Sequence, residues 1–159
     1  MKFKITKKII MGIVTGLIIV VIAIQFVTVE RTNPPVTGEI NVTPELKSVL
    51  QKSCYDCHSN ETVWPWYSKV APVSWLVSKD VVEGREELNF SEWDKYTEKK
   101  RAKKMKEIIE EIDKGDMPMT IYTFMHNNAV LTEKEKELIK NWANEFKAQD
   151  DSILNNNLD

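Results

Sequence analysis

The longest apolar stretch of the chain lies close to its N-terminus. It runs from Ile9 to Val29 without a charged residue, and lysines at positions 2, 4, 7 and 8 precede it. In a helix with a rise of about 1.5 Å per residue this stretch is about 31 Å long, which matches the hydrocarbon core of a bilayer. The pattern predicts a transmembrane helix over residues 9–29, behind a short basic start at residues 1–8.

The alternative for this stretch is a cleaved secretory signal, which shares the basic start but has a shorter apolar region and small residues at its cleavage site. No small-x-small pattern occurs around Ala23 to Phe26, which favours an uncleaved anchor. Lysines before the span keep the N-terminus in the cytoplasm. We therefore expect a single-pass protein of the cytoplasmic (inner) membrane, with its C-terminal domain on the periplasmic, extracytoplasmic side. A cleaved signal would export the same domain.

Beyond the span the apolar positions recur at helical spacing and lack the alternation of strands. Two prolines, Pro34 and Pro35, mark residues 30–42 as a linker. Residues 149–159 are polar and without a period, and we expect a loose tail there. Residues 43–148 between them predict one all-α domain. The expected helices run from Thr43 toward Cys54, from Val73 or Ser74 to Glu83, from about Thr97 to Lys114, and from Thr132 to near Lys147.

Start and stop signals bound these helices. Thr43 is a good N-cap residue, and Thr132 followed by Glu135 has the spacing of a capping box. Gly84 and Gly115 follow the second and third helices and are expected to end them.

Charge is distributed unevenly along the chain. Of its 159 residues, 22 are Lys or Arg and 24 are Asp or Glu, a net charge of −2, but four of the lysines lie before the span. The 18 basic residues that remain oppose 24 acidic ones, and an acidic domain suits nucleic acid poorly because such binding neutralises phosphates. We expect no nucleic-acid partner.

The chain has two cysteines, and both belong to the segment Cys54-Tyr55-Asp56-Cys57-His58. Two thiols at this spacing can each form a thioether with a vinyl group of haem, and the histidine that follows can bind the iron. The motif predicts one covalent haem c, with Cys54 and Cys57 as attachment sites and His58 as the proximal iron ligand.

Two other chemistries use similar residues. A thiol–disulfide pair also has the Cys-x-x-Cys spacing, but it is expected at the end of a strand in a βαβ unit, whereas these cysteines follow a predicted helix. A zinc site would need both cysteines and both histidines, and His126 lies too far from His58 for the usual ligand spacings. Both alternatives rank below haem.

The second axial ligand must come from another segment. Met117, Met119, Met125 and His126 all lie between the last two helices. Met117 leads because Pro118 stiffens the backbone beside it, just after a helix. His126 is the main competitor and would give a bis-histidine centre; otherwise it is expected to bond to the backbone or to a haem propionate.

Aromatic residues gather in the middle of the chain. Trp64, Trp66, Tyr67, Trp75 and Trp93 could enclose the haem and exclude water from its iron, or they could fill an ordinary core. With haem at the centre of the domain the two interpretations nearly coincide.

Several further segments accompany the attachment motif. They are Ser59–Thr62, Trp64–Tyr67, Ala71–Leu76, Glu83–Arg85, Leu88–Ser91, and Met117–Pro118 with Tyr122 and His126. Together, over about residues 30 to 148, they resemble the bacterial haem-binding domain family of cytochrome-c-like proteins. The resemblance implies a cytochrome-c-like fold, covalent haem and a membrane or periplasmic location. It also implies thioethers at Cys54 and Cys57, with His58 and Met117 on the iron. The loop of about thirteen residues between Pro118 and Thr132 departs from small monohaem cytochromes c.

These observations predict a membrane-anchored monohaem cytochrome that carries single electrons between redox partner proteins, and not an enzyme. The sequence does not identify those partners. One alternative is a haem-based sensor with a labile sixth ligand, and a more remote one is a thiol–disulfide oxidoreductase.

Overall fold

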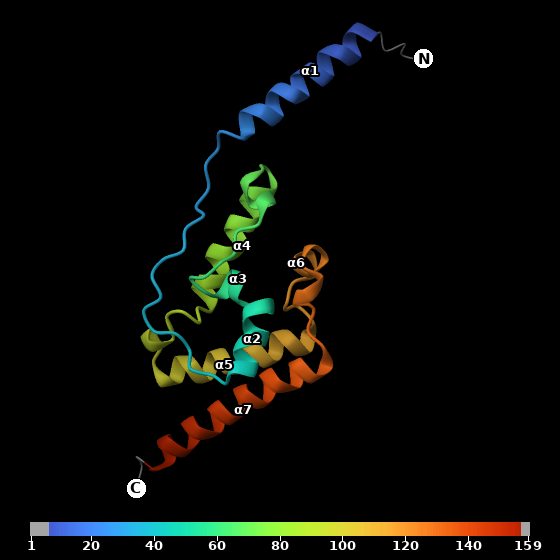
Figure 1. The fold of residues 1–159 in the computed structure, drawn as a ribbon. Coiled ribbons are helices and arrows are strands. Elements are labelled where there is room, and N and C mark those ends of the chain that lie inside the picture. Colours follow the sequence, from blue (N-terminus) through green and yellow to red (C-terminus); the bar gives the residue numbers. More distant parts are fainter. Residues whose placement is uncertain (1–6, 157–159) are drawn as a thin grey trace. The chain divides into compact units, whose positions relative to one another are not determined.

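A computed structural model of the chain describes the backbone of residues 7–156 and the side chains of residues 7–146. All regular elements in this part are helical, and the one strand-like pairing is an isolated bridge between Gly38 and Glu92. The all-α prediction is confirmed. The helices are α1 (Lys7–Ile24), α2 (Pro44–Ser53), α3 (Tyr55–His58), α4 (Val73–Glu87), α5 (Glu98–Lys114), α6 (Thr120–Met125) and α7 (Glu133–Asn156), with short 3-10 turns η1 (Trp66–Lys69), η2 (Trp93–Lys95) and η3 (Asn127–Ala129) (Figure 1).

The described residues form two compact units. The first contains residues 7–32 and 64–80, and the second contains residues 33–63 and 81–156. Helix α4 contributes to both, since the division falls between its residues 80 and 81.

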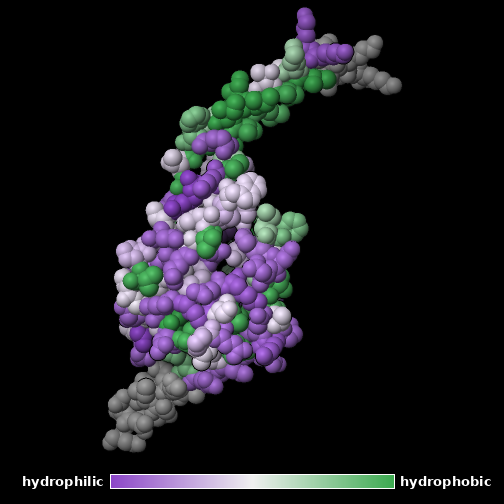
Figure 2. Space-filling view, viewed as in Figure 1, coloured by the Kyte–Doolittle hydropathy of each residue, from purple (hydrophilic) through white to green (hydrophobic). Residues whose placement is uncertain are grey.

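In the first unit, α1 begins with Lys7 and Lys8, carries no charge from Ile9 to Ile24, and buries none of its residues. Most of this helix is green, that is hydrophobic, in Figure 2. Its 18 residues make it long and apolar enough to cross a membrane. It ends at Ile24, earlier than the expected Val29, and the backbone continues in turns, with Val27 N donating to Ile24 O (3.2 Å).

The core of the second unit lies among α2, α5 and α7. Helix α5 packs along α7, and α2 contacts both α3 and α7 (Figure 1). The most deeply buried large side chains are Leu50 of α2, Phe90, Met105 of α5 and Ile139 of α7. The apolar stripes predicted on these helices therefore face one another.

The residues predicted to cap helices α2 and α7 and to end α5 have the expected hydrogen bonds and backbone conformation. Thr43 Oγ1 accepts from Leu46 N (3.4 Å) at the start of α2. At the start of α7, Thr132 Oγ1 accepts from Glu135 N (3.3 Å) and Glu135 Oε2 accepts from Thr132 N (2.9 Å), which is a complete capping box. Gly115 ends α5 with φ 77°, the left-handed conformation that glycine adopts most readily.

Besides the end of α1, two helix ends were predicted wrongly. Helix α4 passes through Gly84 and ends at Glu87, and α7 continues to Asn156, past the expected end near Lys147. A glycine inside a helix lowers stability by only about 1 kcal/mol, so it need not stop one. The residues that follow Lys147, Ala148 and Gln149, are good helix formers, and a helix can continue without an apolar face.

The extended segment before α2 forms backbone hydrogen bonds with residues 90 and 91. Gly38 N donates to Ser91 O (3.1 Å) and Ile40 N donates to Phe90 O (2.9 Å). Ile40 is only 5% exposed and belongs to the core. The end of the predicted linker therefore packs against the domain, a contact that backbone pairing with residues 90–91 produces and that no local sequence pattern indicates.

Candidate cofactor site

A cavity of about 480 Å³ lies in the second unit, a volume within the range of cofactor sites. Three of its lining residues carry sulfur or imidazole groups, the side chains that attach haem or bind its iron: Cys54, His58 and Met117. The others are five aliphatic residues, five charged residues of α4 and α5, and one aromatic residue, Phe90. The full lining is Leu50, Cys54, His58, Glu87, Leu88, Phe90, Lys104, Glu107, Ile108, Glu110, Glu111, Ile112, Met117 and Ile139.

The attachment motif forms a single helical turn directly after α2. Cys54 N donates to Leu50 O (2.8 Å), and His58 N donates to Cys54 O (2.9 Å). The turn brings Cys54 and His58 to the same cavity, while Cys57 is not among the residues that line it. No disulfide joins the two cysteines.

The imidazole of His58 is oriented by the end of α4. Its Nδ1 lies 2.8 Å from Gly84 O and 3.1 Å from Leu88 O, and a carbonyl can only accept, so Nδ1 donates. Burial lowers the pKa of His58 and outweighs these carbonyl bonds, which would raise it. A neutral imidazole whose Nδ1 is a donor has its lone pair on Nε2, the form in which histidine binds a metal.

Gly84 lets α4 approach the motif closely. A Cβ at this position would lie 2.7 Å from Cys57 O and 3.1 Å from Cys57 Cβ. The glycine predicted to end the helix thus has another role, because the absent side chain permits its carbonyl to reach His58.

Arg85 fixes the loop that follows the motif. Its Nε donates to Ser59 O (2.7 Å), and its Nη2 donates to Thr62 Oγ1 (2.8 Å) and to Asn33 Oδ1 (3.0 Å). One side chain thereby joins α4, the loop at residues 59–62 and the extended segment before α2.

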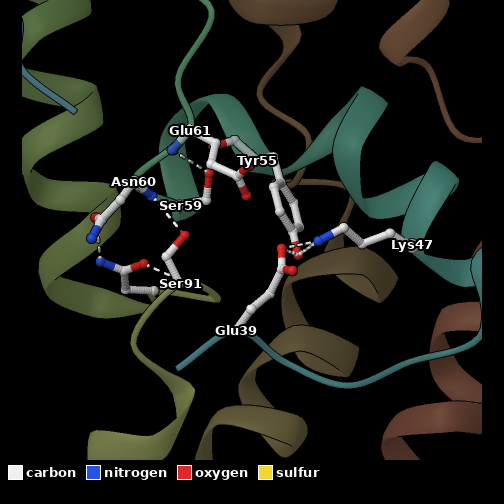
Figure 3. A network of polar contacts seen from close by, with 8 residues as sticks. Glu39, Lys47, Tyr55, Ser59, Asn60, Glu61 and Ser91 are labelled. Atoms are coloured by element: carbon white, nitrogen blue, oxygen red, sulfur yellow. Dashed lines mark hydrogen bonds and ion pairs between the residues drawn. The ribbon is translucent and has the colours of Figure 1, made fainter. Parts of the chain in front are cut away.

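A buried polar network supports the same loop (Figure 3). Asn60 N donates to Ser91 Oγ (3.0 Å), and Asn89 Nδ2 donates to Asn60 Oδ1 (2.9 Å). Phe90 N donates to His58 O (2.8 Å). Because these buried groups satisfy one another, the backbone on both sides of His58 is held in one arrangement.

Tyr55 connects the motif to the cavity wall through its ring. It stacks on Phe90 with ring centroids 5.4 Å apart. Its hydroxyl accepts from Lys47 Nζ (3.0 Å), and Glu39 pairs with Lys47 beside it (Figure 3). Burial raises the pKa of Tyr55, with the charge of Glu61 a smaller cause, so the phenol stays neutral.

Met117 reaches the cavity from the segment that follows α5. Its backbone N donates to Glu111 O (3.2 Å), just past the left-handed Gly115. Within the described residues, Met119, Met125 and His126 do not line this cavity. His126 stacks on Tyr122 (4.4 Å between ring centroids), and its Nδ1 donates to Tyr122 O (3.2 Å).

A hydrogen bond joins this segment to the motif. Tyr122 Oη donates to Asp56 Oδ2 (2.8 Å), and Asp56 Oδ1 accepts from Val63 N (2.9 Å). Asp56, which the motif treats as a spacer, therefore links the residues after His58 with the segment that carries Met117.

The cavity wall also contains a lysine whose side chain is only 9% exposed. Lys104 Nζ lies 2.8 Å from Glu107 and 3.5 Å from Glu87. Burial acts to lower the pKa of Lys104, but the bond to Glu107 and the charge of Glu87 outweigh it and the pKa is raised. The lysine stays charged at neutral pH.

Sequence reasoning missed part of this lining. None of Trp64, Trp66, Tyr67, Trp75 and Trp93 lines the described cavity; Trp93 instead packs in the core against Tyr96. For Trp93 this is the second of the two interpretations, core filling, and the one aromatic residue in the cavity lining is Phe90. Lys104 could have been found, since it precedes Ile108 and Ile112 at intervals of four residues on the apolar face of α5.

The alternatives of zinc and a thiol–disulfide pair fit poorly. In the described residues, no group of three His, Cys, Asp or Glu side chains could hold a metal ion. The cysteines follow a helix and are not at the end of a strand. Burial, and secondarily the charge of Cys57, raises the pKa of Cys54 to about 12, whereas reactive thiols have lowered pKa values.

The site combines an apolar cavity of cofactor size with a thiol, an imidazole and a thioether, the donor set of a haem protein. A family model described as haem-binding domain matches residues 19–145. The chain belongs to this family and is a haem-binding protein, which confirms the resemblance seen in the motifs. Comparison with curated proteins gives no match, and comparison with solved structures gives none.

Proposed function

We propose that this protein is a membrane-anchored, monohaem c-type cytochrome that carries single electrons on the periplasmic side of the cytoplasmic membrane. The observation that supports this most strongly is that Cys54, His58 and Met117 line the same cavity. Met117 lies 59 residues after His58 in the sequence, and a c-type haem with histidine and methionine ligands uses a cysteine, a histidine and a methionine together.

Four residues of the chain are proposed to bind haem directly. Cys54 and Cys57 would form the thioether bonds, and Nε2 of His58 and the sulfur of Met117 would bind the iron. When bound, haem supplies an iron that exchanges one electron between its ferrous and ferric states. Leu88, Ile108 and the other aliphatic lining residues exclude water from the site.

The membrane anchor is α1. The lysines before it support an N-terminus in the cytoplasm and a haem domain outside.

Covalent attachment is tested on a denaturing gel. Protein made together with a cytochrome c maturation system should retain haem stain at its own mass, because thioethers survive unfolding. Cys54→Ala with Cys57→Ala should lose the stain. Haem that leaves the unmutated protein on such a gel would exclude a c-type attachment.

The distal ligand is tested by four single variants. Met117→Ala should abolish the weak red absorption of methionine bound to ferric iron, lower the reduction potential, and open the iron to carbon monoxide. Met119→Ala, Met125→Ala and His126→Ala should keep that absorption, since none of these residues lines the cavity.

The same measurements separate electron carrier from sensor. A carrier should resist carbon monoxide until Met117 is removed, whereas a sensor with a labile ligand would bind it in the unmutated ferrous protein. An unchanged spectrum and potential in Met117→Ala would refute the assignment of this ligand.

A further inference from the structure

The first unit is held together by Gln25, the residue directly after α1. Its Nε2 donates to Ala71 O (3.1 Å) and to Val21 O (2.9 Å), and its Oε1 accepts from Ala71 N (3.0 Å). One side chain therefore binds the end of the apolar helix and both backbone groups of a residue 46 positions away.

Two further bonds hold the same segment beside the chain that leaves α1. Arg31 Nη1 donates to Ser68 O (3.0 Å), and Ser78 Oγ donates to Glu30 O (2.7 Å). Residues 68–78 are thus attached at three points to residues 25–31. This places η1 and the start of α4 at the level where the apolar helix ends.

Large apolar side chains are exposed on this attached segment. Trp66 is 74% exposed, Leu76 is 55% exposed, and Val70 and Val73 are 45% and 42% exposed. Val73 and Leu76 are three residues apart and lie on one face of α4. Exposed apolar side chains gathered within eleven residues of sequence favour a surface that contacts a partner or a membrane.

We propose that Trp66, Val70, Val73 and Leu76 form a lipid-contacting surface that rests in the interfacial layer of the bilayer. The proposal rests on the membrane anchoring by α1 proposed above. If α1 spans the bilayer, its last residue lies at the bilayer surface, and the bonds of Gln25 and Arg31 hold the attached segment there.

The chemistry of the segment fits a lipid interface better than a protein partner. Tryptophan is enriched at the level of lipid headgroups, where its ring is buried and its N–H stays wet. Lys69, exposed between Trp66 and Val70, can extend its ammonium to anionic headgroups while its methylene groups stay among apolar atoms.

The test is photo-crosslinking of the full-length haem-loaded protein in vesicles of phosphatidylcholine with phosphatidylglycerol. Benzoylphenylalanine replaces Trp66 or Leu76 in separate variants. It replaces Val20 of α1 as the control for a residue in the bilayer, and Lys134, whose side chain is 89% exposed on α7, as the control for a polar surface. Lipid adducts are quantified by mass spectrometry, and the haem spectrum checks that each variant is folded.

We expect lipid adducts at positions 66 and 76 that exceed those at position 134 at least tenfold and approach those at position 20. Adducts at position 20 without adducts at 66 and 76 would overturn the lipid-contacting surface but leave the anchor intact. No adduct at position 20 would overturn the anchor and the surface together. Crosslinks from positions 66 and 76 to a second copy of the chain would assign this surface to a protein contact and overturn the proposal.

Discussion

Gly84→Ala tests the close approach of α4 to the attachment motif. The added methyl group would lie 2.7 Å from Cys57 O and 3.1 Å from Cys57 Cβ, and neither atom is the flexible end of a side chain. Either α4 or the motif must therefore move. Since Gly84 O accepts from His58 Nδ1 at 2.8 Å, the movement should also tilt the imidazole.

Two opposing effects decide the change in stability. Alanine inside a helix is favoured over glycine by about 1 kcal/mol. Overpacking by one methyl group in a dense region costs about 1 to 3 kcal/mol. We expect a net loss in the free energy of unfolding of up to about 2 kcal/mol, together with a changed iron site.

Gly115→Ala is the matched control. Its φ of 77° disfavours alanine, but nothing lies within 4 Å of the added carbon. The left-handed conformation costs about 1 to 2 kcal/mol, so this variant should lose similar stability without direct contact with His58.

The assay compares both variants as haem-loaded proteins by guanidinium unfolding, by the absorption and electron paramagnetic resonance of the ferric iron, and by the reduction potential. Gly84→Ala, which acts on His58, should shift the electron paramagnetic resonance signal and the potential and keep the methionine absorption; Gly115→Ala, which lies two residues before Met117, should act on the methionine absorption. A Gly84→Ala protein that is more stable than the unmutated one and has unchanged spectra would refute the argument from close approach.

Two other contacts lend themselves to simple variants. Tyr122→Phe removes the bond to Asp56 and should cost about 1 kcal/mol; it should also make the methionine absorption fade at a lower temperature, whereas Thr123→Val, whose hydroxyl bonds only within its own segment, should not. Loss of the band at equal temperatures in the two variants would contradict a specific role for Tyr122. The pKa of Glu135 is lowered to about 2, first by its bond to a lysine of α2 and then by Thr132 N. The ionised Glu135 carboxylate should therefore stabilise the folded protein fully above its ordinary pKa of 4.5. This contribution should be lost as the pH falls toward 2. Glu135→Ala should destabilise the protein by about 1 kcal/mol at neutral pH, and urea unfolding across this pH range should show the difference from the unmutated protein shrinking; a constant difference would contradict the linkage.

Much of the fold could be predicted because its signals are local. Thr43, Thr132 and Gly115 act through bonds and dihedral angles within four residues of themselves, so the sequence pattern contains all the information they need. The haem motif is local in the same way, because Cys54 and His58 are brought together by one helical turn. For Met117, the sequence supplied a ranking among four candidates, and the structure adds that it alone of the four lines the cavity among the described residues.

Contacts between distant segments could not be predicted from a single sequence. Gly84 has the same local pattern whether it ends a helix or passes close to Cys57, and only the packing of α4 against the motif separates the two. In the sequence, Gln25 is one polar residue in an apolar stretch. In the folded chain, its side chain forms hydrogen bonds with the backbone of Ala71. The sequence thus determined the helices and the chemistry of the attachment turn, because these depend on neighbours along the chain. The tertiary structure decided how His58 is oriented and what encloses the cavity, because these depend on side chains that only folding brings together.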